Sequence, residues 1–377
     1  RGAADGDLVF VSGNPGSTDR EDTMSEIEFL RDYAYPLTIQ TLNRRVKVMS
    51  DYAALGAEQA REASNLIFGL RNSLKALGGE YQGLKDKDLI AKKQKEEDSF
   101  RSSVNKDPRL KESYSGAWDE IAQAEAKQVG MTKQLRYRSI RRSFSRLAGL
   151  ALTIVQYVAE VEKPDTQRLE GFHDSELESL KFMLFSPAPA YPQLERRLLA
   201  DSLQESLEQL GNDDPFIKAV LGDLTPAQVA DEAIGGTKLG DPDYRKKLVE
   251  GGAKAVQASD DPLIALARKI DPFARQFTKW TEENVEGIVT AAGEKIGKAR
   301  FAVYGKSTYP DATFTLRLSY GTVKGYPMNG TQAPSKTTFY GLYDRAYSFD
   351  LKPPFDLTER YKSGKGKLDL SVPLDFV

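Results

Sequence analysis

The spacing of apolar residues changes near the C-terminal end of this chain, and that change most constrains its fold. From residue 313 to residue 320 apolar and polar side chains alternate, with the apolar ones at Phe314, Leu316, Leu318 and Tyr320. A period of two is typical of a half-buried β-strand. The glycines and the proline of residues 321–327 favour turns. We therefore predict a strand at 313–320, within a stretch, 309–326, that differs from the long segment before it.

The N-terminus carries a matching β fragment. Residues 7–12 (DLVFVS) are typical of a short strand, and residues 13–16 (GNPG) are typical of a turn. From Thr23 to Lys298, in contrast, apolar residues recur at the three- and four-residue spacing of helices. The simplest fold with β structure at both ends is one β domain interrupted by a helical insertion. We predict an α+β protein, mostly α, with an irregular helical bundle at residues 21–300.

Helix ends within this block are marked by capping and breaking residues. Thr23 with Glu26 forms a predicted capping box, and Pro36 should kink or split the first helix. Gly78-Gly79 predicts the end of a helix that starts at Glu58. Thr225 and Asp261 each precede a proline and predict two further helix starts.

The remaining β structure is predicted between residue 301 and the C-terminus. Candidate strands there are 301–304, 313–320, 336–342 and 367–372. So few strands are not stable alone, and we expect them to need partners from outside this chain.

Composition excludes several classes of function. The chain has 53 basic and 55 acidic residues, so its charge does not favour nucleic acid or an anionic membrane as a partner. A basic run at Arg136, Arg138, Arg141, Arg142 and Arg146 is surrounded by acidic helices, which predicts interhelical ion pairs. No apolar run is long enough to span a bilayer. With no cysteine and one histidine, a metal site is not expected, and we predict no cofactor.

Three segments together resemble the S46 serine peptidases. They are VFVSGNPGST at residues 9–18, TYPDATFTLRLSYGTVKGY at residues 308–326 and KLDLSVPLDFV at residues 367–377. These peptidases are bacterial dipeptidyl peptidases with a chymotrypsin-like double β-barrel and an inserted helical domain. The resemblance implies that residues 1–20 and 301–377 are parts of that barrel. It also implies export to the periplasm or cell surface, and a tendency to form homodimers.

The resemblance places the catalytic residues outside this chain. The family's Asp and His would precede Arg1, and its Ser, in a GNSGSP-type motif, would follow Val377. We therefore expect a segment that lacks the triad and is inactive alone, and we assign no catalytic residue within it. The substrates implied for the whole enzyme are peptides with a free N-terminus. A non-catalytic helical scaffold or peptide-binding module, or a degenerate homologue without its nucleophile, is the alternative.

The family resemblance singles out Asn72 as a substrate-binding residue. Asn72, Lys75 and Gly78 match the family pattern of Asn, Lys three residues later and Gly three residues after that. The family's Asn binds the free α-amino group of the substrate, and an amide oxygen is a suitable acceptor for an ammonium. The rival candidate is Asn65, and a surface position without a ligand is the ordinary alternative for both.

Other polar candidates have structural explanations. His173 is followed directly by Asp174 and Ser175, and such close neighbours rarely form a triad. Ser175 instead resembles a helix cap. Asp311 is predicted to form a turn and Arg317 an ion pair, and neither is assigned to catalysis.

Overall fold

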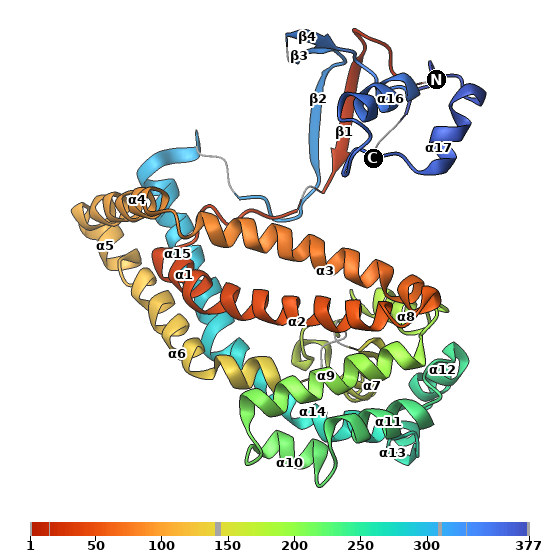
Figure 1. Cartoon of the computed structure of the whole chain (residues 1–377). Helices are drawn as coiled ribbons and strands as arrows, with labels where there is room; N and C mark the ends of the chain where they lie inside the picture. Colours follow the sequence, from red (N-terminus) through yellow and green to blue (C-terminus); the bar gives the residue numbers. More distant parts are fainter. Residues whose placement is uncertain (1, 15, 140–144, 308–310, 329, 375–377) are drawn as a thin grey trace. The chain divides into compact units, whose positions relative to one another are not determined.

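The computed structural model describes residues 2–14, 16–139, 145–307, 311–328 and 330–374. The chain forms two compact units. Unit 1 comprises Arg1–Glu21 and Pro310–Val377, and unit 2 comprises Asp22–Tyr309. Each unit is described by itself below, with the element labels of Figure 1.

In its described residues, unit 2 forms only helices and helical turns as regular structure. Its first part contains α1 (Met24–Phe29), the π-helical turn η1 (Leu30–Ala34), α2 (Tyr35–Ala53), α3 (Ala57–Gly83), α4 (Lys87–Lys106), α5 (Pro108–Tyr114) and α6 (Ala117–Tyr137). Its middle part contains α7 (Arg146–Glu160), η2 (Asp165–Gln167), α8 (Leu177–Leu184), α9 (Pro192–Leu210), α10 (Pro215–Leu221), α11 (Pro226–Gly236), α12 (Pro242–Glu250) and α13 (Gly252–Ala258). It ends with α14 (Pro262–Thr281), the π-helical turn η3 (Glu282–Glu286), α15 (Gly287–Tyr304) and η4 (Gly305–Ser307).

The main core of unit 2 forms around α7, which is buried along most of its length. Its apolar residues include Leu150, Ile154 and Val158, which pack with residues of α9, α10, α11 and α14. A second core joins α4, α6 and α15 through Phe100, Trp118 and Ile296. These faces explain the irregular bundle, because each helix buries one apolar stripe against a different set of neighbours.

Several helix starts predicted from local signals are confirmed. Thr23 and Glu26 form the predicted capping box, and Thr225, predicted as a helix start, forms a capping box with Gln228. Asp261 caps α14 by accepting from two backbone amides. The helix is split before Pro36 as expected, because the π-helical turn η1 precedes α2. Ser175 does not cap α8, whose first flanking residue is Glu176.

Two helical predictions are wrong. Helix α3 continues through Gly78-Gly79 to Gly83, because its packing against α2 outweighs the weak helix propensity of two glycines. The helical spacing of apolar residues from 133 to 161 also predicts one long helix, but α6 ends at Tyr137 and α7 begins at Arg146.

The described arginines of the basic run bind partners that lie far away in the sequence. The Arg138 guanidinium pairs with Asp214 at 2.6 Å, which confirms one predicted interhelical ion pair. Arg136 donates to the Leu37 carbonyl, and Arg146 donates to the carbonyls of residues 188 and 189. Arg141 and Arg142 lie outside the described residues.

Unit 1 contains short strands and short helices. They are β1 (Leu8–Gly13), β2 (Arg317–Thr322), β3 (Tyr326–Met328), β4 (Thr331–Ala333), α16 (Phe339–Ser348), α17 (Glu359–Gly364) and η5 (Lys365–Lys367). Strands β1 and β2 pair antiparallel, with Leu8 opposite Thr322 and Gly13 opposite Arg317. The two ends of the chain therefore meet in one ribbon, and β3 and β4 form a separate hairpin. The described part of unit 1 does not close a β-barrel.

Three of the predicted strands are wrong. Residues 301–304 are the last turn of α15, where Val303 packs against the core that contains Phe100. Residues 336–342 lead into α16, because Tyr343 and Ala346 lie on a helical face that packs on Leu357. Residues 367–372 form a turn closed by hydrogen bonds from Ser371 to the Asp369 carboxylate.

The strand predicted at 313–320 is present but shifted toward the C-terminus. Strand β2 starts at Arg317, because Phe314 has a left-handed backbone with φ of 58° that no regular strand accepts. The kink is held by the Gly16 carbonyl, which accepts from the Phe314 N–H at 3.0 Å.

Candidate functional site

The candidate site is the exposed face of α3, which the α2–α3 hairpin holds in place (Figure 1). The buried face of α3 carries Ala63, Ile67 and Leu70 at helical spacing. These residues pack against Met49 and Tyr52 of α2 and against the start of α9. With one face fixed in this way, the side chains on the opposite face are held in a set direction.

The opposite face of α3 exposes two amides and a phenyl ring. Asn65, Phe68 and Asn72 are all exposed, and Phe68 has 76% of its surface in solvent. Their spacing of three and four residues places them in one row along the helix. Asn65 and Asn72 are two helical turns apart, roughly 10 Å along the axis. The candidate and its rival therefore lie on the same face, which we call the amide face.

The amide face is chemically open. Within the described ranges, the Asn72 side chain has no hydrogen-bond partner, and neither has the Asn65 side chain. A Cβ placed on Gly69 or Gly79 would meet no atom within 4 Å, so the helix surface beside the amides is uncovered. Amide oxygens and an exposed ring can both bind an ammonium group, the ring through cation–π attraction.

Phe68 was not among the predicted site residues, although its spacing in the sequence places it in the same row as both asparagines. The row Asn65, Phe68, Asn72 has the spacing of one helical face, and an apolar ring in a row of polar residues is unexpected on a solvated face. Only the burial of the opposite row shows that this one is exposed.

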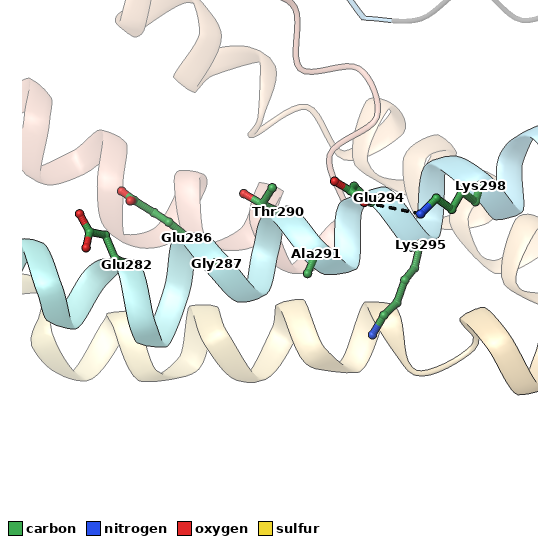
Figure 2. Close-up of a pocket in the computed structure, with 8 residues that line it drawn as sticks. All are labelled: Glu282, Glu286, Gly287, Thr290, Ala291, Glu294, Lys295 and Lys298. Atoms are coloured by element: carbon green, nitrogen blue, oxygen red, sulfur yellow. Dashed lines mark ion pairs between the residues drawn. The ribbon is translucent and has the colours of Figure 1, made fainter. Parts of the chain in front are cut away.

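A second candidate is the open hollow along η3 and α15 shown in Figure 2. Glu282, Glu286 and Glu294 line it, and Lys298 pairs with Glu294 at 3.5 Å. Lys295 points away to α6, where it binds Glu120 at 2.7 Å. Burial raises the pKa of Glu282, and the neighbouring Glu286 adds to this effect by repulsion. The hollow is a charged surface groove, and nothing in its geometry selects a ligand.

His173 is part of a surface ion-pair network. Its Nδ1 lies 3.5 Å from an Asp165 carboxylate oxygen, which also accepts the Asp174 N–H at 2.8 Å. Arg168 pairs with Asp174 at 2.7 Å. Among the residues with described positions, no hydroxyl group is hydrogen-bonded to His173, so the structure gives this histidine no nucleophile to activate.

Asp311 collects hydrogen bonds from the N-terminal segment. One oxygen accepts from the Thr18 hydroxyl at 2.7 Å and from Arg20 Nε at 2.9 Å, and the other accepts from the Glu21 N–H at 3.0 Å. Burial alone would raise the pKa of the Asp311 carboxyl, but these hydrogen bonds outweigh burial and hold the pKa below its ordinary value. The Arg317 guanidinium donates to the Asp311 carbonyl at 3.3 Å. Asp311 thus forms an ion pair with Arg20 instead of the predicted turn, and Arg317 contacts a backbone carbonyl instead of forming the predicted ion pair.

The part of the chain that the structure describes contains neither a candidate metal site nor a candidate membrane-spanning helix. No group of three or more His, Asp or Glu side chains is arranged to hold a metal ion. No helix is long and apolar enough to cross a membrane.

Comparison with known proteins identifies the family. The family model for peptidase S46 matches residues 1–377. The chain belongs to peptidase family S46. Among curated S46-like relatives, an Asp/Glu-specific dipeptidyl-peptidase of Shewanella putrefaciens is 26% identical over 86% of this chain and 45% of its own length. A dipeptidyl-peptidase 7 of Porphyromonas endodontalis is 24% identical over 91% of this chain and 42% of its own length. This S46 chain therefore spans about half the length of the relatives that it matches.

Solved structures show the same fold. The crystal structure of Porphyromonas endodontalis DPP11 in complex with the dipeptide Arg-Glu matches 99% of this S46 chain and 54% of its own, with a TM-score of 0.60 at 16% identity. The same protein in complex with the dipeptide Arg-Asp gives the same TM-score. The mostly helical architecture with few strands is thus shared with that protein.

Proposed function

We propose that this chain is the helical domain and adjoining β segment of a serine-type dipeptidyl peptidase, which releases dipeptides from peptides with a free N-terminus. The observation that carries the proposal is the amide face of α3, an exposed row of unpartnered acceptors on a chain of family S46. The names of the curated relatives support the reaction class.

In this proposal, Asn72 binds the α-amino group of the substrate. An ammonium has three N–H donors, and an amide oxygen accepts one of them without adding charge. Phe68 lies one turn from Asn72 and offers its ring face to the same cation. Because the Asn72 amide and the Phe68 ring are held in fixed positions on α3, they fix the position of the substrate's α-amino group. The first two residues of the substrate then occupy fixed positions as well. The scissile bond is then the second peptide bond.

The chemistry belongs to the rest of the enzyme. A serine would attack the scissile carbonyl, a histidine would take and return its proton, and an aspartate would orient the histidine. Backbone amides would stabilise the oxyanion. The helical unit would close over this site and exclude water. We expect the 377-residue chain alone to release no dipeptides, since its single histidine pairs with Asp165 at the surface.

The β1–β2 ribbon supports a larger β structure in the whole protein. Phe10, Leu318 and Tyr320 lie on one face of the ribbon, and each has more than 60% of its surface exposed. An apolar sheet face of this kind is normally covered in a folded protein. We propose that the ribbon belongs to a chymotrypsin-like barrel completed by other strands of the enzyme. The periplasmic or cell-surface location and the homodimer expected of the family are part of the same proposal.

The test is an Asn72→Ala variant of the full-length protein, assayed on dipeptidyl substrates with free and acetylated N-termini. Loss of one hydrogen bond to a charged group should lower kcat/KM for the free substrate by about 10- to 100-fold. Activity on the acetylated substrate should be negligible for both proteins.

Two controls separate binding from folding. Asn105→Ala removes an exposed helical asparagine from α4 and should leave kcat/KM unchanged. Asn65→Ala tests the rival residue on the same face. Equal activity of the Asn72→Ala and wild-type proteins would exclude the role of Asn72. Absence of dipeptide release by the wild-type protein would favour a non-catalytic scaffold.

A further inference from the structure

Unit 1 contains a pocket of about 760 Å³ that is lined by the β3–β4 hairpin and by helix α16, both labelled in Figure 1. One wall is a face of the hairpin. Tyr326 lies opposite Ala333, and Met328 lies opposite Thr331, so these four side chains point to the same side of the two strands. All four line the pocket. Its volume is in the range of sites that bind small molecules.

A second wall is one face of α16. Gly341, Asp344 and Ser348 recur at the three- and four-residue spacing of a helical face, and all three line the pocket. Another face of the same helix is buried, because Tyr343 packs on Leu357. The packing of that face fixes the direction in which the pocket-lining side chains project.

Two opposite charges line the pocket without neutralising each other. Among its lining residues, only Asp344 and Arg345 are charged. Neither side chain forms a hydrogen bond or an ion pair with any residue whose position the structure describes, and they do not pair with each other. The pocket therefore offers one carboxylate and one guanidinium to a ligand.

Each of these charges lies beside an aromatic ring. Tyr340, which is 65% exposed, lines the pocket one helical turn before Asp344, so its ring and the carboxylate are neighbours on the helix surface. The Arg345 guanidinium lies 4.9 Å from the ring centroid of Phe349 and 5.1 Å from that of Phe355. These rings restrict the guanidinium but leave its N–H groups available. The first pair of groups attracts a cation, and the second binds a carboxylate.

We propose that this pocket, which we call the α16 pocket, binds a free dipeptide with its ammonium group on Asp344 and its carboxylate on Arg345. A ligand with only one of these charges would leave the other protein group unpaired. The ends of an extended dipeptide are roughly 7 Å apart, twice the span of one amino acid, which suits two groups that do not touch each other. Met328 and Leu342 supply apolar surface for its side chains. The choice of a dipeptide among zwitterions rests on the proposed function, because that reaction releases dipeptides.

The test is calorimetric binding of the dipeptide Leu-Leu to the 377-residue chain, in its free, N-acetylated and C-amidated forms. Each modification removes one of the two charges of the peptide, and with it one charge-assisted hydrogen bond. Because Asp344 and Arg345 are exposed and solvent screens them, we expect each modification to raise Kd by about 5- to 20-fold. Free leucine should bind more weakly than Leu-Leu, since it is too short to reach both groups.

Variants assign each charge of the peptide to its partner. In Asp344→Asn, the affinity for free Leu-Leu should fall to that of the acetylated form, and acetylation should have no further effect. In Arg345→Gln, amidation should likewise have no further effect. Asp350→Asn and Arg360→Gln make the same changes at exposed positions of unit 1 that do not line the pocket. These two control variants should leave every Kd unchanged.

Three outcomes would overturn the inference. Equal Kd values for the three forms of Leu-Leu would show that the pocket does not distinguish the charges of the peptide. An unchanged Kd in Asp344→Asn and Arg345→Gln would place the binding elsewhere. The same titrations on the full-length protein test whether its other segments fill the pocket, and absence of binding there would be the third.

Failure of the inference is distinguishable from failure of the proposed function. Absence of dipeptide release by the wild-type full-length protein would count against the proposed function alone, because the titrations with Leu-Leu require no turnover. A full-length enzyme that releases dipeptides, but whose Kd for Leu-Leu does not depend on Asp344, would keep the proposed function and exclude the α16 pocket.

Discussion

Charged side chains of unit 2 are buried in several kinds of environment. Arg45 is 1% exposed and pairs with Asp201 and Glu205. Arg245, equally buried, donates to three backbone carbonyls. Glu125 of α6 is half-buried, and one of its carboxylate oxygens is buried without a hydrogen-bond partner in the described structure. None of these environments could be predicted from the sequence, since arginines and glutamates in helices are mostly solvated.

Glu125 should make stability depend on pH. Burial, together with repulsion from Glu26 and Asp22, raises its pKa from 4.5 to about 7. In the unfolded chain the carboxyl ionises near 4.5, and in the folded protein ionisation is resisted up to about 7. Its contribution to the unfolding free energy is therefore full below pH 4.5 and lost as the pH rises to 7. Glu125→Gln should stabilise the protein by about 1 to 2 kcal/mol at pH 8.5, after discounting for partial exposure, and have little effect at pH 4.5.

Urea unfolding at the two pH values measures this difference. Glu178→Gln, at an exposed position of α8, serves as the matched control and should change stability by less than about 0.5 kcal/mol at either pH. If Glu125→Gln gave the same stability change at pH 4.5 and pH 8.5, the assigned titration would be wrong.

At the scale of elements, the sequence predicts helix starts better than helix ends. A capping box depends on four consecutive residues, so Thr23 and Thr225 could be identified locally. The last turn of α15 depends instead on Val303 meeting a core that includes Phe100, about two hundred residues earlier in the chain. The amide face is an intermediate case. Asn72 followed from a resemblance, but the exposure of its whole row follows from the packing of Ala63 on the other side.

Helix α3 offers a direct test of how far local helix propensity contributes to stability beside tertiary packing. Gly79 lies inside the helix, is exposed and has φ outside the left-handed region, and a Cβ there would meet no atom within 4 Å. Gly79→Ala should therefore stabilise the protein by about 0.5 to 1 kcal/mol, because alanine loses less backbone entropy in a helix. Denaturant unfolding measures the change.

The contrasting variant is Gly211→Ala. Gly211 ends α9 with φ of 84°, a conformation that a Cβ disfavours, so alanine should destabilise the protein by about 1 kcal/mol. Equal effects of the two substitutions would show that helix propensity does not control the stability of α3.

At the scale of the whole molecule, the sequence predicted β structure at both ends and helices between, but not how that β structure is completed. The pairing of β1 with β2 joins residues more than three hundred positions apart, and the alternation of residues 313–320 indicates which faces they share. The alternation does not determine the number of strands in the sheet. It indicates that one face of the strand is covered, but not which elements cover that face. The separation of the β3–β4 hairpin from the ribbon likewise has no local signal.

Substitutions on the apolar face of the β1–β2 ribbon should have opposite effects in the 377-residue chain and in the full-length enzyme. Phe10 and Tyr320 pair across the strands with ring centroids 6.2 Å apart, and Leu318 follows on the same face. In the 377-residue chain, a Phe10→Thr, Leu318→Thr double variant should bind less hydrophobic dye and associate less, with the unfolding of unit 2 unchanged. In the full-length enzyme, where we propose that other strands cover this face, the same variant removes buried apolar side chains. It should then lower the unfolding free energy by about 2 to 5 kcal/mol.

Val11→Thr, on the opposite face of β1, controls for effects on the strand itself, because valine and threonine have similar shapes and similar strand propensity. Its effect should be small in both contexts. The comparison decides what the ribbon is. If the double variant were harmless in the full-length enzyme, the face would be solvent-exposed there as well, and the ribbon would be a free-standing pair of strands. A loss of stability confined to the full-length enzyme would show that strands outside these 377 residues pack on this face, as a closed barrel requires.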